Sequence, residues 1–363
     1  MTKPFLEKID LFNARTKGFH TYRIPLIVVS QKGTVLAFGE ARKKASDWAG
    51  GSLVMRRSVN NGKTWEPMKI IASSVNKPVH NAVAIVAKDS NVIHFLYCYN
   101  YKKAFYMQSK DDGETFSEPK EITHVFDAFK SEFNFRILAT GPGHSIQLEN
   151  GRLIVPVWLA RRHIHRPSVI SVIYSDDDGN TWQHGEIIKG SLVNPSETQA
   201  VQLTDGTVLL NIRHETKISR RAISISKDGT RNWTDPQFDE GLVEPVCFAS
   251  IIRFTHPIKE GKSRILFSNP DSIEGEPWKV FNLRPRRRLS IKLSYDECKT
   301  WPINKVLETG MSGYSDLAIG KNFTIYCLYE RGSETGSDFN NSSLCVARLN
   351  LDWLTDGCDT IGR

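Results

Sequence analysis

SDDDGNTW, the segment Ser175–Trp182, recurs in modified form along the chain at a regular interval. A close copy is SKDDGETF at Ser109–Phe116. Three looser copies are SVNNGKTW at Ser58–Trp65, SKDGTRNW at Ser226–Trp233 and SYDECKTW at Ser294–Trp301. The copies begin 51, 66, 51 and 68 residues apart, a mean of 59, so a chain of 363 residues has room for about six such units. A motif repeated at this interval predicts a fold built from repeated supersecondary units.

Each copy has the chemistry of a tight turn between two strands. Its Ser and Asp side chains bind nearby backbone amides, and Asp-Gly or Asn-Gly supplies residues that tolerate positive φ. The Trp or Phe at its end folds back as an apolar plug. Segments beside the turns, such as RIPLIVVS at Arg23–Ser30 and RLIVPVWLA at Arg152–Ala160, are typical of strands, and almost none of the chain has a sustained helical period. We therefore predict one all-β domain over residues 1–363, a six-bladed β-propeller.

The acidic residues of these turns suggest calcium loops as an alternative. An EF-hand loop needs an acidic ligand at position 1 when its glycine is at position 6, but with Gly179 at position 6 the first position is Tyr174. His163 and His165 share one face of a strand without a third ligand nearby, and the Gly-rich run 141–144 lacks the Lys-Ser/Thr of a phosphate loop. We therefore expect the turns to be structural and the protein to hold no metal or cofactor.

The chain carries 48 Lys and Arg residues against 40 Asp and Glu, a formal net charge of +8. An excess of positive charge favours an anionic partner. Both signs are interspersed, however, which argues against a track for nucleic acid; the one local exception is the run RPRRR at Arg284–Arg288. No apolar run approaches the roughly 20 residues of a membrane-spanning helix.

Six cysteines are scattered without a Cys-x-x-Cys pair, which predicts free and mostly buried thiols in a reducing compartment. The first residues, MTKPFLEKIDLF, contain no apolar core of a signal peptide. We expect a cytoplasmic protein if Met1 is the native start, and a secreted or periplasmic protein if a leader has been removed.

Four features occur in an order that resembles one family: YRIP at 22–25, the five turns, GYSD at 313–316 and LYE at 328–330. They resemble the sialidases, or exo-α-neuraminidases, of the bacterial and animal glycosidase type, over about Phe19 to Glu330. The resemblance implies a six-bladed propeller, in agreement with the spacing of the turns. It also implies release of terminal α-ketosidically linked sialic acids from glycoproteins, glycolipids and oligosaccharides, with retention of configuration.

Sialic acid carries a carboxylate on its anomeric carbon, and this feature explains which residue types such an enzyme needs. Arginine forks match the two oxygens of a carboxylate. A carboxylate nucleophile would be repelled by the substrate, whereas a tyrosine that loses its proton to a glutamate during the attack would not. Sialidases accordingly use a tyrosine nucleophile.

The resemblance implies that Arg23, Arg213 and Arg286 bind the substrate carboxylate and that Arg42 lines the pocket. Within the basic run, the family pattern Arg-x-x-apolar before the last turn falls on Arg286, and Arg287 is its nearest competitor. The position of the run inside a predicted sheet favours this role over a nucleic-acid or localisation patch.

The resemblance also implies a catalytic set. Asp47, 24 residues after Arg23, corresponds to the general acid/base, Tyr314 to the nucleophile and Glu197 to its partner, while Glu330 supports the first arginine. As a general acid Asp47 must be protonated in the first step. Either its pocket raises its pKa, therefore, or the enzyme prefers acidic pH.

Two departures from the family pattern concern the periphery of the sugar site. CFAS at 247–250 places Phe248 where relatives often have a glutamine near the glycerol side, and FRIL at 135–138 replaces a segment that often carries Trp and Tyr. They leave open a hydrolase for a related ulosonic acid, KDN or Kdo. A trans-sialidase and a non-catalytic glycan-binding propeller are further alternatives. We expect a monomer that binds sialylated glycans and neither nucleic acid nor a membrane.

Overall fold

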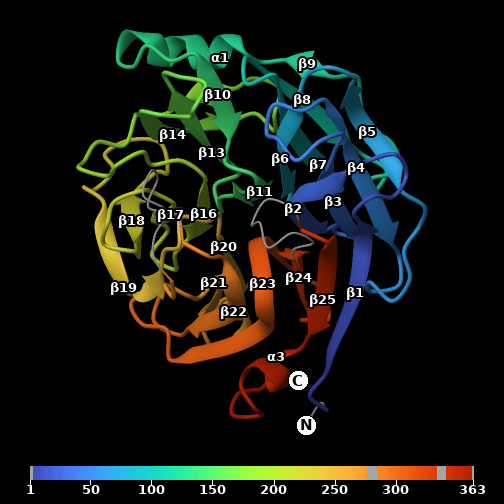
Figure 1. Cartoon of the computed structure of the whole chain (residues 1–363). Helices are drawn as coiled ribbons and strands as arrows, with labels where there is room; N and C mark the ends of the chain where they lie inside the picture. The colour runs from blue at the N-terminus through green and yellow to red at the C-terminus, as the bar shows by residue number, and fades with distance from the viewer. Residues whose placement is uncertain (1–2, 276–283, 333–340, 362–363) are drawn as a thin grey trace.

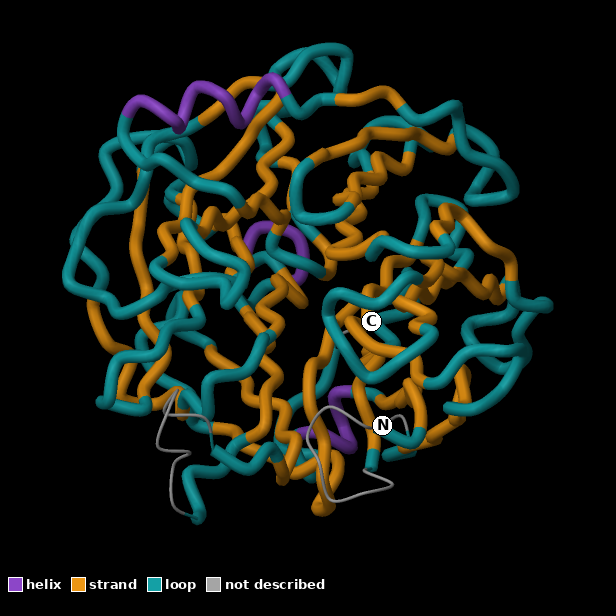
Figure 2. Tube along the Cα trace, turned by 45° about the horizontal axis from the view of Figure 1, so that its top comes forward, coloured by secondary structure: helices purple, strands orange, loops and turns teal. Residues whose placement is uncertain are grey.

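β-Strands make up most of the regular structure. The computed structural model describes residues 3–275, 284–332 and 341–361, and within them lie 25 strands, three four-residue α-helices and one 3-10 helix. The prediction of an all-β protein is therefore confirmed. The strands form five sheets that lie around a common centre, as Figures 1 and 2 show.

Two sheets come from the segment 21–144. The first has the order β2-β3-β4-β5, and its strands are β2 (Thr21–Val29), β3 (Val35–Arg42), β4 (Gly51–Ser58) and β5 (Lys69–Ser74). The second has the order β11-β6-β7-β8-β9, and its strands are β6 (Val79–Val86), β7 (Ile93–Tyr99), β8 (Lys103–Ser109), β9 (Lys120–Glu121) and β11 (Gly143–His144). Pairing in both sheets is antiparallel except between β11 and β6.

Two further sheets come from the segment 137–243. The third has the order β10-β13-β14-β15, with β12 paired to β13, and its strands are β10 (Ile137–Thr140), β12 (Ile146–Gln147), β13 (Leu153–Ala160), β14 (Ser168–Ser175) and β15 (Gln183–His184). The fourth has the order β16-β17-β18-β19, and its strands are β16 (Thr198–Gln202), β17 (Val208–Ile212), β18 (Arg220–Ser226) and β19 (Gln237–Val243).

The remaining sheet has seven strands and joins the two ends of the chain. Its order is β1-β25-β24-β23-β22-β21-β20, and its strands are β20 (Ser250–Thr255), β21 (Arg264–Pro270), β22 (Arg287–Ser294), β23 (Ile303–Ile319), β24 (Ile325–Arg331), β25 (Ser343–Leu349) and β1 (Leu6–Asn13). The long strand β23 pairs with β22 up to Met311 and with β24 from Ser312 onward. The sheet therefore consists of two four-strand groups that share β23.

Neighbouring sheets pack against each other around the centre. β2 contacts both β6 and β23, β16 contacts both β13 and β20, and β20 contacts β23. Apolar side chains fill the spaces between sheets; Phe38 of β3 and Phe95 of β7, for example, are fully buried with ring centroids 5.1 Å apart. The short helices are α1 (His124–Asp127), η1 (Ala128–Ser131), α2 (Pro257–Glu260) and α3 (Leu351–Leu354).

The five repeated turns contain the hydrogen bonds that their sequence predicts. In the third turn, Ser175 Oγ accepts a hydrogen bond from the amide of Gly179 at 2.9 Å, and Asp177 Oδ1 accepts one from the amide of Thr181 at 2.8 Å. Trp182 is buried and packs against β8 of the preceding sheet. These contacts confirm that the turns are structural elements that join one sheet to the next.

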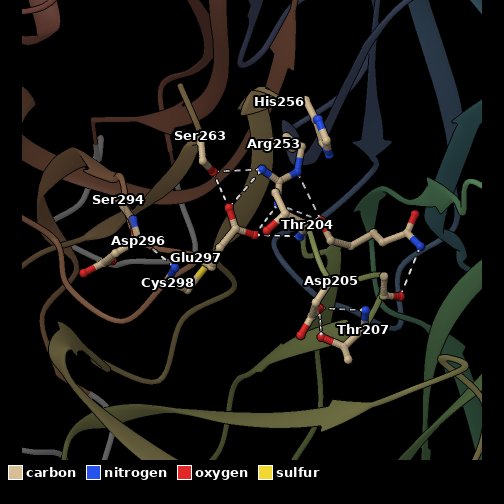
Figure 3. Close-up of polar contacts among 12 residues, drawn as sticks. Thr204, Asp205, Thr207, Arg253, His256, Ser263, Ser294, Asp296, Glu297 and Cys298 are labelled. Atoms are coloured by element: carbon tan, nitrogen blue, oxygen red, sulfur yellow. Dashed lines mark hydrogen bonds and ion pairs between the residues drawn. The ribbon is translucent and has the colours of Figure 1, made fainter. Parts of the chain in front are cut away.

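The fifth turn, drawn in Figure 3, departs from the others because a cysteine replaces the glycine. Cys298 has a φ of 67°, in the left-handed region, and its amide donates to Ser294 Oγ at 3.0 Å. Glu297 of this turn receives hydrogen bonds from Arg253 Nη2 at 2.6 Å and from the Thr204 amide at 2.8 Å. The turn therefore keeps its conformation and also connects the fourth sheet to β20.

All six cysteines are free; five are buried and Cys358 is exposed, as predicted. Of the helices in the described segments, none has the length and apolar character required to cross a membrane.

Candidate active site

Seven of the eight predicted site residues line one cavity of about 200 Å³. The cavity lies where the innermost strands of different sheets approach each other, so it collects residues that are far apart in the sequence. The seven are Arg23 on β2, Arg42 on β3, Asp47 on the loop after β3, Glu197 before β16, Arg213 after β17, Arg286 before β22 and Tyr314 on β23. Glu330 on β24 lies behind this wall and contacts two of its members.

The cavity has an excess of positive charge. Among its described lining residues are five arginines and three carboxylates: Arg23, Arg42, Arg166, Arg213, Arg286, Asp47, Glu197 and Glu215. The positive excess favours an anionic ligand, and planar guanidinium forks suit a carboxylate in particular.

Tyr314 and Glu197 are in direct hydrogen-bond contact in the wall of the cavity. The Tyr314 hydroxyl lies 2.8 Å and 2.6 Å from the two carboxylate oxygens of Glu197, and both side chains are more than nine-tenths buried. Arg213 Nη1 donates to the Tyr314 hydroxyl at 2.7 Å and also pairs with Glu197. The glutamate is therefore placed to accept the phenolic proton while the arginine stabilises the resulting oxygen charge.

Burial raises the pKa of Tyr314 well above its ordinary value. The guanidinium of Arg213 opposes this shift, and the carboxylate of Glu197 adds to it. The phenol is therefore protonated at neutral pH, so it gains nucleophilic character only as its proton moves to Glu197.

Three arginines surround the aromatic ring of Tyr314. The guanidinium carbons of Arg23, Arg213 and Arg286 lie 5.4, 6.0 and 5.3 Å from the ring centroid. Arg286 is buried and donates to the Val246 carbonyl at 2.8 Å. A carboxylate on the atom attacked by Tyr314 would therefore lie within reach of all three cations.

Glu330 fixes Arg23 and the nucleophile strand together. Its carboxylate accepts from Arg23 Nε at 2.9 Å and from Arg23 Nη2 at 3.1 Å, with both side chains buried. It also accepts from the backbone amides of Ile24 and Tyr314, each at 3.1 Å. One carboxylate thus sets the position of an arginine relative to the tyrosine.

The backbone around the cavity is strained at several positions. Ile24 has a φ of 55°, which is uncommon for a β-branched residue, and the register between β2 and β3 shifts at this point. The bulge turns Arg23 toward Glu330 and the cavity. Four more lining residues, Asn81, Tyr101, His165 and Asn194, also have positive φ. Strain of this kind concentrates at functional sites because packing elsewhere maintains it.

Asp47 lies at the mouth of the cavity, where 40% of its side chain is exposed. Its Oδ1 accepts from Arg42 Nη1 at 2.7 Å, and Arg42 is itself held by the buried Glu40. Burial raises the pKa of Asp47, but Arg42 and Arg23 outweigh burial and hold it well below its usual range. The direction of this shift favours the second alternative considered above, in which the enzyme prefers acidic pH.

Tyr101, Trp158 and His165 give the cavity an aromatic wall that the sequence did not reveal, and Trp48 packs against this wall. Trp48, next to Asp47, lies 4.7 Å from the Tyr101 ring and 5.5 Å from the His165 ring, and Trp158 lies 5.2 Å from His165. His163 and His165 were expected on one face of a strand, and this is wrong because both lie in the loop between β13 and β14, where His165 is half-buried in this cluster. Its positive φ depends on contacts between loops, which a local pattern does not report.

Phe248 and the segment 135–138 do not lie where the sequence predicted. Phe248 is fully buried and packs against Tyr314 with ring centroids 5.4 Å apart, so it forms the floor under the nucleophile and not the rim of the sugar site. Phe135 belongs to a core cluster, and Ile137 and Leu138 are buried in β10. Phe248 and the apolar residues of 135–138 are therefore internal packing changes, whereas Arg136 is exposed.

Comparison with known proteins identifies the family of this chain. The family model of the "BNR repeat-like domain" matches residues 98–327, more than half of the chain. A sialidase of Micromonospora viridifaciens is 29% identical over 98% of this chain and 55% of its own length. The chain belongs to the BNR-repeat sialidase family. Enzymes of this family are glycoside hydrolases.

Two more relatives extend the likeness of this sialidase-family protein. Sialidase-3 of Bos taurus is 27% identical over 97% of this chain and 95% of its own length. The solved structure of the Hadza microbial sialidase Hz136 has a TM-score of 0.81 and 26% identity, covering 96% of this chain and 69% of that one. The chain therefore spans about half of one relative and nearly all of another.

Proposed function

We propose that this protein is an exo-α-sialidase that releases terminal sialic acids from glycoconjugates. The observation that carries the proposal is the Tyr314–Glu197 contact of 2.6–2.8 Å beneath Arg23, Arg213 and Arg286. A tyrosine–carboxylate pair alone would suit many reactions. Three guanidinium groups around that tyrosine restrict the substrate to a sugar whose anomeric carbon carries an acid.

In the first step, the Tyr314 oxygen attacks the anomeric carbon while its proton passes to Glu197. The bond between the anomeric carbon and the glycosidic oxygen breaks, and that oxygen takes a proton from Asp47. Arg213 stabilises the charge shared between Tyr314 and Glu197. The product of the step is a glycosyl–tyrosine intermediate and a free alcohol.

In the second step, water attacks the anomeric carbon from the side that the leaving group occupied. Asp47, now a carboxylate, takes a proton from this water, and the bond to the Tyr314 oxygen breaks as Glu197 returns its proton. Two displacements at one carbon give retention of configuration. The exposed position of Asp47 at the cavity mouth supports this role, because the leaving group and the water both enter there.

The same proposal includes a six-bladed β-propeller as a single catalytic domain that acts as a monomer. The division of the seven-stranded sheet into two groups around β23 supports six blades, since the other four sheets then make up the remainder. The near-complete overlap with bovine sialidase-3 supports a single domain.

A fluorogenic aryl α-ketoside of N-acetylneuraminic acid tests the proposal, with KDN and Kdo analogues beside it across pH 4–8. We expect release from the first substrate. Release only from an analogue would identify another ulosonic acid as the substrate. Transfer to an added galactoside in preference to water would make the protein a trans-sialidase. If none of the three substrates is hydrolysed, glycan binding is left as its function.

Tyr314→Phe tests the nucleophile assignment with Tyr174→Phe as a matched control. Tyr174 donates a hydrogen bond to Gln183 at 3.0 Å in the third sheet, away from the cavity. We expect the first variant to lose more than about 1,000-fold in kcat on a natural sialoside while it still binds the product. The second should keep its turnover, and near-normal turnover of Tyr314→Phe would refute the assignment.

A further inference from the structure

Asp316 lies on β23 two residues after Tyr314 and is fully buried. Five hydrogen bonds from four different strands reach its carboxylate. Oδ1 accepts from His144 Nδ1 at 2.7 Å, Gln199 Nε2 at 2.9 Å and Ser250 Oγ at 3.1 Å, and Oδ2 accepts from the amides of Ile27 and His144 at 2.9 Å each. These donors occupy the acceptor positions of both oxygens.

The network lies one step below the catalytic pair. Residues two apart on a strand face the same side, about 7 Å from each other. Asp316 follows Tyr314 by two positions on β23, and Gln199 of β16 follows by two positions Glu197, which directly precedes that strand. The Gln199–Asp316 hydrogen bond at 2.9 Å therefore repeats the Tyr314–Glu197 contact one step deeper.

No backbone ladder joins β16 to β23 in the described part of the chain, because the two strands belong to different sheets. Their separation is consequently set by side chains. Gln199 is held at both ends of its amide, since its Oε1 accepts from the Ile251 amide at 3.0 Å while its Nε2 donates to Asp316. A further bond from Nε2 to the His144 carbonyl at 3.2 Å completes the contacts that fix its orientation.

We propose that Asp316 and Gln199 are positioning residues that set the separation between the Tyr314 oxygen and the Glu197 carboxylate. The proposal rests on the sialidase function proposed above. Neither residue lines the cavity, so both act through the strands that carry the catalytic pair.

Substitutions that exchange hydrogen-bond donors and acceptors between Asp316 and Gln199 distinguish the positioning role from a general contribution to stability. In Asp316→Asn, the amide oxygen must face the amides of Ile27 and His144, because backbone N–H groups cannot accept. Its NH₂ then faces Ser250 and the His144 ring, which can both accept after rotation or tautomer exchange. Gln199 Nε2 is the one donor left facing another donor.

Gln199→Glu removes that conflict, because one oxygen of the new carboxylate accepts from the NH₂ group introduced by Asp316→Asn while the other still accepts from the Ile251 amide. Alone, Gln199→Glu places two carboxylates face to face. We expect each single variant to lose about 100-fold in kcat with KM changed less than threefold, as displacement of a reacting group by about 1 Å predicts. The double variant should recover at least tenfold of this loss; recovery is partial because the Gln199 bond to the His144 carbonyl at 3.2 Å is absent.

Asp239→Asn is the matched control. Asp239 is also a buried carboxylate, which accepts from the Gly241 amide at 2.9 Å and from Trp301 Nε1 at 3.0 Å, but it lies on β19 at the outer edge of its sheet. We expect a lower melting temperature with unchanged kcat. If Asp316→Asn behaves in the same way, or if the folded double variant recovers no turnover, the positioning role is overturned.

Crystal structures of Asp316→Asn and the double variant provide a readout that does not depend on turnover. The separation between the Tyr314 oxygen and Glu197 should increase in the first and return in the second. If the wild-type protein is inactive, the proposed sialidase function is refuted but the positioning role is not. The separations between the Tyr314 oxygen and Glu197 in the two variant structures would still decide whether Asp316 and Gln199 set this distance. An unchanged separation in Asp316→Asn overturns the inference.

Discussion

Replacement of Glu330 by glutamine removes one negative charge from the centre of the molecule and preserves the shape of the side chain. Arg23 then has a buried charge whose closest counter-ion is gone, since the side chains of the pair are only 3% and 1% exposed. The single glutamine oxygen can accept hydrogen bonds from some of the donors that now reach Glu330, which are Arg23 and the amides of Ile24 and Tyr314. The NH₂ group of the glutamine then faces the remaining donors and cannot accept from them. The variant therefore removes the carboxylate that neutralises a buried charge and leaves hydrogen-bond donors unsatisfied.

The loss of one partner from a buried ion pair costs about 3–5 kcal/mol. An unfolding entropy of roughly 2.1 cal/mol/K per residue gives about 0.8 kcal/mol/K for 363 residues. We therefore expect Glu330→Gln to lower the melting temperature by roughly 4–7 °C. A carboxylate ligand supplies a new counter-ion for Arg23. At a concentration that saturates both proteins, N-acetylneuraminic acid should therefore raise the melting temperature of the variant by more than it raises that of the wild type.

Differential scanning calorimetry measures these shifts in melting temperature. Initial rates on the fluorogenic sialoside give kcat/KM, which should fall roughly 10- to 100-fold in Glu330→Gln because Arg23 loses its orientation. Asp359→Asn is the control, because Asp359 forms a similar bidentate pair with the buried Arg264 at 2.6 and 2.7 Å near the C-terminal end. It should melt earlier and keep its kcat/KM. Wild-type activity in Glu330→Gln would refute the reasoning, as would a melting temperature within about 1 °C of the wild type, far below the expected shift.

Two further predictions concern the arginines of the cavity. Arg286→Ala should weaken binding of the product by roughly 10- to 100-fold, as loss of charge-assisted hydrogen bonds predicts. Arg287→Ala should change this affinity less than twofold because Arg287 is exposed. Isothermal titration calorimetry measures both affinities, and the reverse order would assign the third carboxylate-binding arginine to Arg287. Arg42→Gln removes a cation that keeps the pKa of Asp47 low, so that pKa should rise by roughly 1–3 units. Because Asp47 must be protonated in the first step, the alkaline limb of the kcat/KM profile should move to higher pH, and an unmoved limb would contradict its role as the acid.

The turns and the short catalytic motifs were predictable because their information is local. A Ser, an Asp and a Gly within five residues fix their own hydrogen bonds, as Ser175, Asp177 and Gly179 do. The order of the motifs along the chain then identified the residues that share the cavity. Even the substitution of Cys298 for glycine leaves the fifth turn intact, since the remaining local bonds persist.

The aromatic wall and the state of Asp47 were not predictable in the same way. Trp48 and His165 meet only because two loops from different sheets approach each other. Phe248 was placed at the rim by analogy, yet its ring packs under Tyr314. For Asp47, the sequence contains Arg42 but not the 2.7 Å contact that decides the direction of the pKa shift.

The polar network around Asp316 follows from the way the sheets meet. Inner strands have an edge, or part of an edge, without a neighbouring strand, so some of their amides have no partner in a ladder. A buried amide without a partner is costly. The Ile27 amide on β2 is satisfied by Asp316, that of Ile251 on β20 by Gln199, and that of Leu317 on β23 by Ser250. Each of these side chains comes from an inner strand that does not pair with the strand it serves. An apolar centre would leave these donors buried and unpaired, so the requirement to satisfy inner edges is also what ties together the strands that carry the catalytic pair.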